Sequence, residues 1–282
     1  MTLISILFAL IAERLGARSA RWQIATYAHW YERKSAPLLS RLQQLHNGIG
    51  LMLWLLVPTL VIAAFVHASD FILWQLAVNT LVILICFGCA HMRANYKGYL
   101  NALTRDDGEA ATLYALQMGQ KRTENESGGE TFAQTLAWVN FRFYCAVIFW
   151  FVVLGAPGAV FYALVRTCVD DSEQTSHPLS KQHSLLVRVG HWLEWPAARI
   201  ASLGYLVIGN FSKGTQCWLR HVLDFRVSNR QVITETALAA EQIELAHYGC
   251  TIEAQCMIRL VKRNVLFFLA LIALLTLFGG LS

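Results

Sequence analysis

Four long stretches of the chain carry no Asp, Glu, Lys or Arg, and segments that hold all of the charges separate them. The stretches are Ile49–Val66, Phe71–Ala90, Phe143–Val165 and Val265–Ser282. Because a helix needs about 20 mostly apolar residues to cross a bilayer, each stretch predicts a transmembrane helix. The first two stretches are close enough to form a transmembrane hairpin over 49–90. We therefore expect an all-α integral membrane protein, a helical bundle built as a single membrane domain over 1–282.

The charged segments indicate which parts of the chain face which side of the membrane. Segments rich in Lys and Arg tend to lie in the cytoplasm. This tendency places the juxtamembrane segment 1–48 and the helical regions 91–142 and 212–263 on the cytoplasmic side, and the acidic segment 167–195 in a periplasmic loop. Residues 1–12 are apolar but too few to span, so we expect a helix lying against the bundle.

Within 91–142 the pattern predicts three helices. The first covers His91–Leu103, and the second begins at a cap formed by Asp106 and Asp107. Gln120–Glu130 is polar and contains paired glycines, which predicts a loop. Thr131 then begins a helix that is expected to continue without a break into the span 143–165. Gly155, Pro157 and Gly158 predict a kink or break within that span.

Four spans alone leave the basic cluster before Val265 on the outer side, against the tendency of basic residues to face the cytoplasm. One further crossing by residues 196–211 removes the conflict. This segment contains Arg199, so a transmembrane helix here would have to face the interior of the bundle. A re-entrant or interfacial helix over 196–211 is the alternative that the pattern leaves open.

Composition narrows the class of protein further. Hydrophobic residues make up 56% of the 282 residues and charged residues only 15%, whereas soluble domains carry about 25% charged residues. This excludes a secreted disulfide-rich domain, a disordered chain and a nucleic-acid-binding protein. The net charge of +5 reports membrane topology, so the partner implied is the lipid bilayer. The seven cysteines predict no disulfide framework, and the Gly- and Ala-rich spans leave oligomerisation open.

No cofactor or metal motif is evident in the sequence. Lys213 precedes Gly214, whereas a P-loop requires Gly-Lys-Ser/Thr, so any nucleotide would have to bind without a P-loop. The nine histidines are dispersed and show no paired spacing typical of a metal site. We therefore predict no metal site. The sequence identifies no catalytic residue.

The most informative string is Trp138-Val-Asn-Phe-Arg-Phe-Tyr144, placed where a helix is expected to enter the membrane. Helical spacing puts Trp138 and Arg142 on one face, and Asn140 and Tyr144 on another. One interpretation is a snorkelling arginine beside an aromatic belt. The other is a polar pocket in which Arg142 binds an anionic group while Asn140 and Tyr144 orient it. Further candidates for the rim of this pocket are Glu13, Arg93, Arg105 and Asp106.

The chain resembles the AmpE family over essentially its full length. The resemblance is carried by Glu13-Arg14-Leu15, Tyr99-Leu-Asn-Ala102 with Arg105-Asp-Asp107, the string from Trp138 to Tyr144, Trp195-Pro196 with Arg199, and Asp224-Phe225. It adds Arg199 and Asp224 to the ligand-binding candidates. It also implies a multi-pass protein of the bacterial inner membrane that modulates β-lactamase induction and cell-wall muropeptide recycling signalling. Cytoplasmic AmpD or a muropeptide-type ligand would be its partner.

That family is in turn similar to the CobD/CbiB membrane proteins of cobalamin biosynthesis. The similarity here lies around Asn140, in Phe149–Gly158 and in Pro196–Arg199. It implies an alternative function, a membrane-embedded enzyme that acts on a small anionic or cell-wall-derived substrate. A second alternative is a transporter of small solutes or muropeptides, which would use polar residues inside the spans. Regulation without catalysis is the leading hypothesis.

Overall fold

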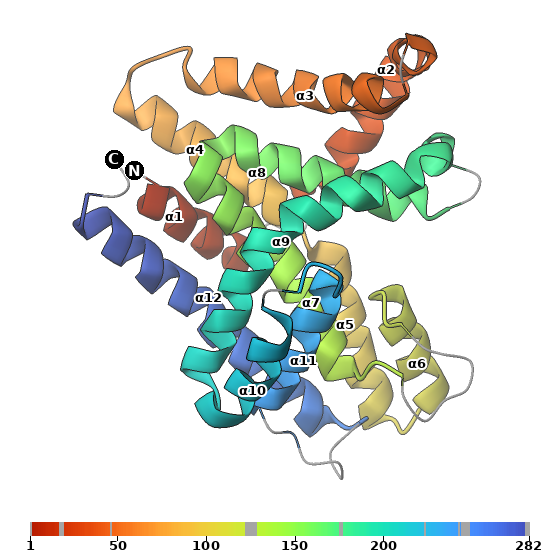
Figure 1. Ribbon diagram of the computed structural model, residues 1–282, viewed down its shortest axis with the longest axis vertical. Coiled ribbons are helices and arrows are strands. Elements are labelled where there is room, and N and C mark those ends of the chain that lie inside the picture. Colours follow the sequence, from red (N-terminus) through yellow and green to blue (C-terminus); the bar gives the residue numbers. More distant parts are fainter. Residues whose placement is uncertain are drawn as a thin grey trace. The chain divides into compact units, whose positions relative to one another are not determined.

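The computed structural model describes residues 2–16, 20–45, 47–121, 129–174, 177–222, 224–241, 243 and 249–279. Every regular element within these ranges is a helix (Figure 1), which confirms the predicted all-α fold. The chain forms two compact units. The first unit contains Met1–Gly88, Ala146–Glu194 and Ile272–Ser282, and the second contains Cys89–Cys145 and Trp195–Leu271.

Among the described residues, three helices are long and apolar enough to cross a membrane. They are α3 (Asn47–Val66), the helix Phe132–Ser172 and α12 (Thr251–Leu277). A fourth span is obtained if α4 (Ile72–Phe87) and α5 (Ala90–Thr104), which meet at a bend of 42°, count as one. These helices cover most of each of the four charge-free stretches, so the membrane character predicted from the sequence is confirmed.

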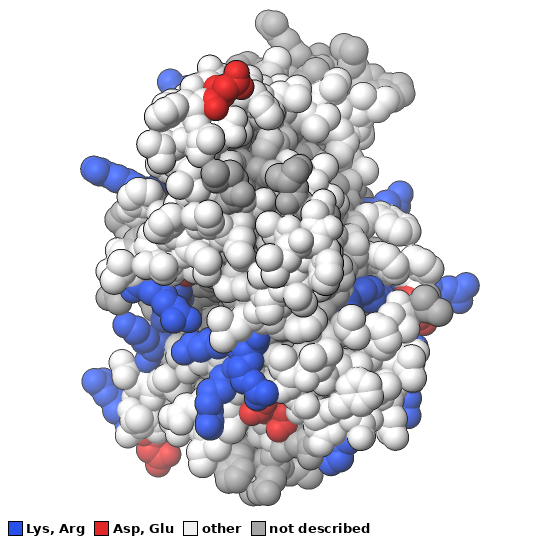
Figure 2. Space-filling model, turned by 90° about the vertical axis from the view of Figure 1, so that its left-hand side faces the viewer, with Lys and Arg blue, Asp and Glu red and all other residues white. Residues whose placement is uncertain are grey.

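The surfaces of these helices are suited to lipid. Leu60 on α3, Leu73 on α4 and Leu274 on α12 are more than half exposed, and contiguous apolar exposure of this kind marks a membrane or partner surface. Figure 2 shows basic side chains gathered in one group on the face that it draws.

In the first unit, α8 (Ala146–Ser172) packs against α3 and α4, and α1 (Thr2–Leu15) packs against α4. The sequence predicts an N-terminal helix lying against the bundle, and α1 contacts α4. Gly155 interrupts α8 with φ 71° and ψ −162°, a backbone conformation that favours glycine, and Pro157 follows it. The predicted break in this span is therefore present.

Helix α2 (Ile24–Leu45) contacts the end of α8 and His177, which follows it. His29 Nε2 lies 3.0 Å from Asp171 Oδ2, and His177 Nε2 lies 3.4 Å from Glu32 Oε2. Charge counting places 1–48 and 167–195 on opposite sides of the membrane, but these polar contacts join them at one place. Residues 167–195 are also largely helical rather than a loop, because they include the end of α8, η3 (Pro178–Gln182) and the start of α9.

Helix α9 runs without interruption from His183 to Ile208 and so includes most of the predicted fifth crossing. It is not among the described helices that are long and apolar enough to span, so a crossing by 196–211 stays a prediction. Its second half packs closely against α12 in the second unit. Asn264 Nδ2 donates a hydrogen bond to Ala201 O at 3.2 Å, and a Cβ on Gly204 would overlap the Asn264 side chain.

The second unit also contains α6 (Gly108–Gln117), α7 (Phe132–Asn140), α10 (Phe211–His221) and α11 (Asn229–Glu241). Its helices pack in the pairs α5 with α6, α7 with α11, and α10 with α11. Two helix starts follow the predicted caps. Asp107 Oδ1 accepts a hydrogen bond from Ala110 N at 2.9 Å, and Thr131 forms a capping box with Gln134. Most of the predicted loop Gln120–Glu130 lies outside the described residues.

A candidate ligand site formed by helices α5, α6, α7 and α12

A short π-helix over Phe141–Cys145 changes which side chains of the predicted string lie together. Asn140 Oδ1 accepts a weak hydrogen bond from Cys145 Sγ at 3.8 Å, five residues further on. This is the repeat of a π-helix, in which backbone hydrogen bonds join i and i+5. Asn140 is therefore aligned with Cys145, whereas the ordinary helical spacing predicts that it is aligned with Tyr144.

Tyr144 instead turns toward α5. Its hydroxyl accepts a hydrogen bond from Arg93 Nη2 at 2.7 Å and lies 3.0 Å from Cys89 Sγ. The structure thus brings together two of the predicted site residues, Arg93 and Tyr144, from segments about fifty positions apart. A charge-assisted hydrogen bond of this length holds the start of α5 against the π-helical segment.

Trp138 is the centre of a second cluster. The guanidinium carbons of Arg142 and Arg230 lie 5.9 and 5.6 Å from its ring centroid, within the range of cation–π attraction. Arg230 also pairs with Glu130, with Nε on Oε1 at 2.9 Å and Nη2 on Oε2 at 2.5 Å. Glu130 and Arg230 were not predicted as site residues, because a hundred residues separate them and neither belongs to a motif.

Arg199 also contacts Asp224, but it binds the backbone carbonyl of Asp224 and not the carboxylate. Arg199 Nε donates to Val222 O at 2.9 Å, and its Nη2 donates to Asp224 O at 3.2 Å. The Asp224 carboxylate accepts a hydrogen bond from Arg226 N at 2.8 Å. Arg199 therefore binds the backbone at Val222 and Asp224, while its buried Nη1 has no hydrogen-bond partner among the described residues.

The remaining predicted residues lie elsewhere. Glu13 is buried in α1 of the first unit. Arg105 and Asp106 form the exposed turn between α5 and α6, where Asp106 has φ 58°.

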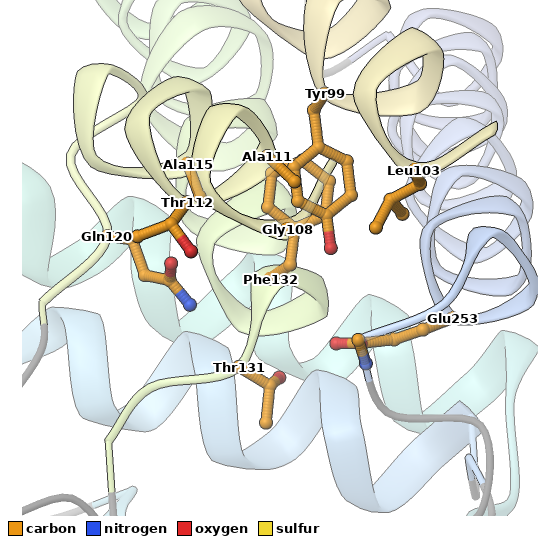
Figure 3. Close-up of a pocket in the computed structure, with 11 residues that line it drawn as sticks. Tyr99, Leu103, Gly108, Ala111, Thr112, Ala115, Gln120, Thr131, Phe132 and Glu253 are labelled. Carbon is orange, nitrogen blue, oxygen red and sulfur yellow. The ribbon is translucent and has the colours of Figure 1, made fainter. Parts of the chain in front are cut away.

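A cavity of 260 Å³ lies between α5, α6, the start of α7 and the start of α12 (Figure 3). Its lining residues come from four separate segments and combine small, aromatic and polar side chains: Tyr99, Leu103, Gly108, Ala111, Thr112, Ala115, Gln120, Thr131, Phe132, Gly249 and Glu253. Ligand pockets usually measure about 300–1,000 Å³, so this cavity fits a fragment of a ligand rather than a large molecule.

Aromatic rings form one wall of the cavity. Tyr99 and Phe132 stack with centroids 3.5 Å apart and planes 13° apart. Figure 3 shows the Tyr99 hydroxyl, the Gln120 amide and the Glu253 carboxylate directed toward the space between their helices. Gln120 Nε2 donates to Glu130 O at 2.6 Å, whereas its buried Oε1 has no hydrogen-bond partner among the described residues.

Glu253 positions two sides of the cavity. Its side chain is 1% exposed, and its two oxygens accept hydrogen bonds from Ala133 N at 2.7 Å and Gly249 N at 2.6 Å. Ala133 lies in the first turn of α7, where a negative charge also interacts favourably with the helix dipole. Glu253 therefore ties the start of α12 to the start of α7.

The cavity is richer in hydrogen-bond acceptors than in charged donors. Carboxylate and amide oxygens accept hydrogen bonds, and the hydroxyls of Thr112 and Thr131 can accept or donate. A ligand that offers hydroxyl or amide N–H groups beside an apolar face fits this lining best. No sequence motif identifies these residues, because ordinary residue types from four segments meet here only in the folded chain.

Taken together, the apolar helices and this partly polar cavity define an all-helical membrane protein with a candidate binding site. A family described as "Regulatory signalling modulator protein AmpE" matches residues 1–282. The chain therefore belongs to the AmpE family.

Two curated relatives extend this assignment. The chain is 28% identical over 297 residues to Protein AmpE from Shigella flexneri, with 100% of each chain covered. A shorter similarity, 37% identical over 73 residues, links it to the cobalamin biosynthesis protein CobD from Chromobacterium violaceum and covers 26% of this chain and 23% of that protein. No solved structure matches the chain.

Proposed function

We propose that this protein is a multi-pass inner-membrane regulator of β-lactamase induction and cell-wall muropeptide recycling signalling, acting together with AmpD. We further propose that the cavity lined by Tyr99, Gln120 and Glu253 binds its ligand. The observation that carries the proposal is this partly polar, aromatic-walled cavity in a membrane protein of a family described as regulatory signalling modulators.

The chemistry of the cavity supports a muropeptide-type ligand. Such a ligand combines sugar hydroxyls with peptide amides, and both supply hydrogen-bond donors. The Gln120 Oε1 atom is a buried acceptor without a partner among the described residues, and an unmade hydrogen bond of this kind costs about 1–3 kcal/mol. A donor from the ligand would recover that free energy. The volume of 260 Å³ suits one sugar ring or one peptide unit rather than the whole ligand.

Filling the cavity tests the proposal. Ala111 is 4% exposed and lines the cavity, so Ala111→Phe should exclude a ligand. Leu113 lies on the same helix, is 60% exposed and does not line the cavity, so Leu113→Phe is the matched control. Both variants are expressed in cells that lack the native gene, and the cells are exposed to a β-lactam. β-Lactamase activity and muropeptide pools are then measured, with membrane insertion checked by immunoblotting.

We expect loss of the gene to change induction and muropeptide pools, Leu113→Phe to restore both, and Ala111→Phe to restore neither. Unchanged induction and unchanged pools after gene deletion would contradict the regulatory function. Full restoration by Ala111→Phe would retain the regulatory function but reject the cavity as its ligand site.

The similarity to CobD favours a second candidate function, a membrane-embedded enzyme that acts on a small anionic or cell-wall-derived substrate. Arg142 beside Trp138 and Asn140 at the π-helical segment would then belong to the substrate site. Arg142→Ala and Asn140→Ala should abolish turnover while the variants insert and unfold like the parent protein. Normal function in both variants would leave these residues with a structural role and would reject the enzyme.

A further inference from the structure

A cysteine, a histidine and a glutamate converge where α10 packs against α11. Cys217 and His221 are four positions apart on α10, so they lie on one face of that helix. Glu235 reaches them from α11. Its Oε2 atom lies 3.2 Å from His221 Nε2 and 4.0 Å from Cys217 Sγ. One ligand atom from each of the three residues falls within 4.8 Å of the other two.

These separations match those of ligands around one tetrahedral zinc ion. Zinc binds sulfur at about 2.3 Å, and histidine nitrogen or carboxylate oxygen at about 2.0–2.2 Å. Tetrahedral angles then place nitrogen and oxygen about 3.4 Å apart, and sulfur and oxygen about 3.6 Å apart. The observed distances of 3.2 and 4.0 Å differ from these values by only a few tenths of an ångström. Small rotations of the side chains would therefore suffice to bind the ion.

The surroundings of the cluster also fit a metal ion. Gln231 Nε2 donates a hydrogen bond to Glu235 Oε1 at 2.7 Å, and such outer contacts orient metal-binding carboxylates. The side chains of His221 and Glu235 are 19% and 36% exposed, so an ion can enter from solvent. A thiol loses its proton when it binds zinc, so binding would release one proton from Cys217 to solvent as the metal–sulfur bond forms.

We propose that Cys217, His221 and Glu235 bind a divalent transition metal ion of the zinc class. One thiolate, one neutral imidazole and one carboxylate supply three ligands and two negative charges, so the site neutralises the dication. The fourth position is left to water or to an incoming ligand, as in zinc sites that are not purely structural. No pair of histidines marks this site in the sequence, and the third ligand lies fourteen positions beyond His221 on another helix.

Cobalt(II) titration of the purified full-length protein in detergent, without an affinity tag, tests the proposal. Cobalt is a spectroscopic substitute for zinc, and a cobalt–thiolate bond absorbs in the near ultraviolet. We expect this absorption to saturate at about one equivalent of cobalt and to disappear when zinc is added in competition. Zinc binding in weakly buffered solution should release about one proton per ion, because the Cys217 thiol ionises. Absence of the thiolate absorption from the wild-type protein would overturn the proposal without reference to any variant.

Variants then locate the site. Cys217→Ser should remove the thiolate absorption, and both Cys217→Ser and Glu235→Gln should weaken zinc binding by more than about 100-fold. Gln231→Ala should weaken zinc binding by about 10-fold, as the loss of a group that hydrogen-bonds to a metal ligand typically does. Cys256→Ser is the matched control, because Cys256 is a part-buried cysteine on α12, and it should bind like the wild type. Retention of the absorption by Cys217→Ser, or its loss in Cys256→Ser, would overturn the assignment.

Discussion

The Glu253 carboxylate holds two backbone amides, and Glu253→Ala is expected to lower the free energy of unfolding by about 4 kcal/mol. Ala133 is fully buried, so its amide loses a charge-assisted hydrogen bond without gaining water, which costs about 3 kcal/mol. Gly249 is exposed, so its amide can return to water, which limits that loss to about 1 kcal/mol.

The glutamine variant separates the two contributions. Glu253→Gln keeps one oxygen, which can still accept from Ala133 N, but it loses the charge and the bond to Gly249 N. We expect it to cost about 2 kcal/mol, half the effect of alanine. Both variants should weaken the connection between α7 and α12 that shapes the cavity. The loss of stability should therefore accompany weaker ligand binding.

Thermal unfolding in detergent, followed with a thiol-reactive fluorophore, measures these effects. Cys86 of the first unit and Cys145 of the second unit are free and fully buried, so their reaction reports unfolding. With about 2–4 °C per kcal/mol, the apparent Tm should fall by about 8–16 °C for alanine and about 4–8 °C for glutamine. Scan rates must be equal, because unfolding of such proteins is often irreversible. The exposed Gln255→Ala on α12 is the control. Equal losses for alanine and glutamine, or a loss below about 1 kcal/mol for alanine, would refute the reasoning.

Three further predictions concern other parts of the fold. Gly88→Ala should destabilise the first unit by about 1–3 kcal/mol, because the new Cβ would lie 2.7 Å from Gln23 Cα and 2.9 Å from Trp22 O; an unchanged Tm would contradict this. Arg230→Lys keeps the charge but loses the bidentate contact with Glu130, so it should lower stability by about 1–2 kcal/mol in the same assay, and a neutral result would show that the geometry is unimportant. Burial raises the pKa of Glu32, with His177 and His29 opposing the shift and Asp171 adding to it. The folded state therefore holds its proton to higher pH than the unfolded state, so stability should fall as pH rises above about 4.5 through the raised pKa. Tm measured against pH should show this decline in the parent protein and a smaller one in Glu32→Gln, and identical profiles would count against it.

Features set by neighbouring residues could be predicted from the sequence. The charge-free stretches became the long apolar helices, Asp107 and Thr131 capped the helices that follow them, and the break in α8 fell at Gly155. Each of these depends on a few consecutive residues, so the local pattern contains the information.

Features that depend on tertiary contacts could not be predicted in this way. The π-helix moved Asn140 out of line with Tyr144, although an ordinary helical repeat places them together. Arg230 and Glu130 meet across a hundred residues. The cavity combines residues of unremarkable type from four segments. The sequence named Arg93 and Tyr144 as candidates for one pocket, and the two residues are in contact, but it did not indicate the cavity.

The contact between His29 and Asp171 has a consequence for how the chain threads the membrane. Between these residues the chain passes through α3, the bent pair α4–α5 and the helix Phe132–Ser172. Three complete passages would leave His29 and Asp171 at opposite membrane faces, but their side chains are 3.0 Å apart. If these helices cross a bilayer, an even number of passages separates the two residues. The number of passages becomes even if one interrupted helix enters and leaves the membrane through the same face. That helix is either the one bent after Phe87 or the one broken at Gly155. The interruption that turns the chain back thus decides which side of the membrane the segments after it face.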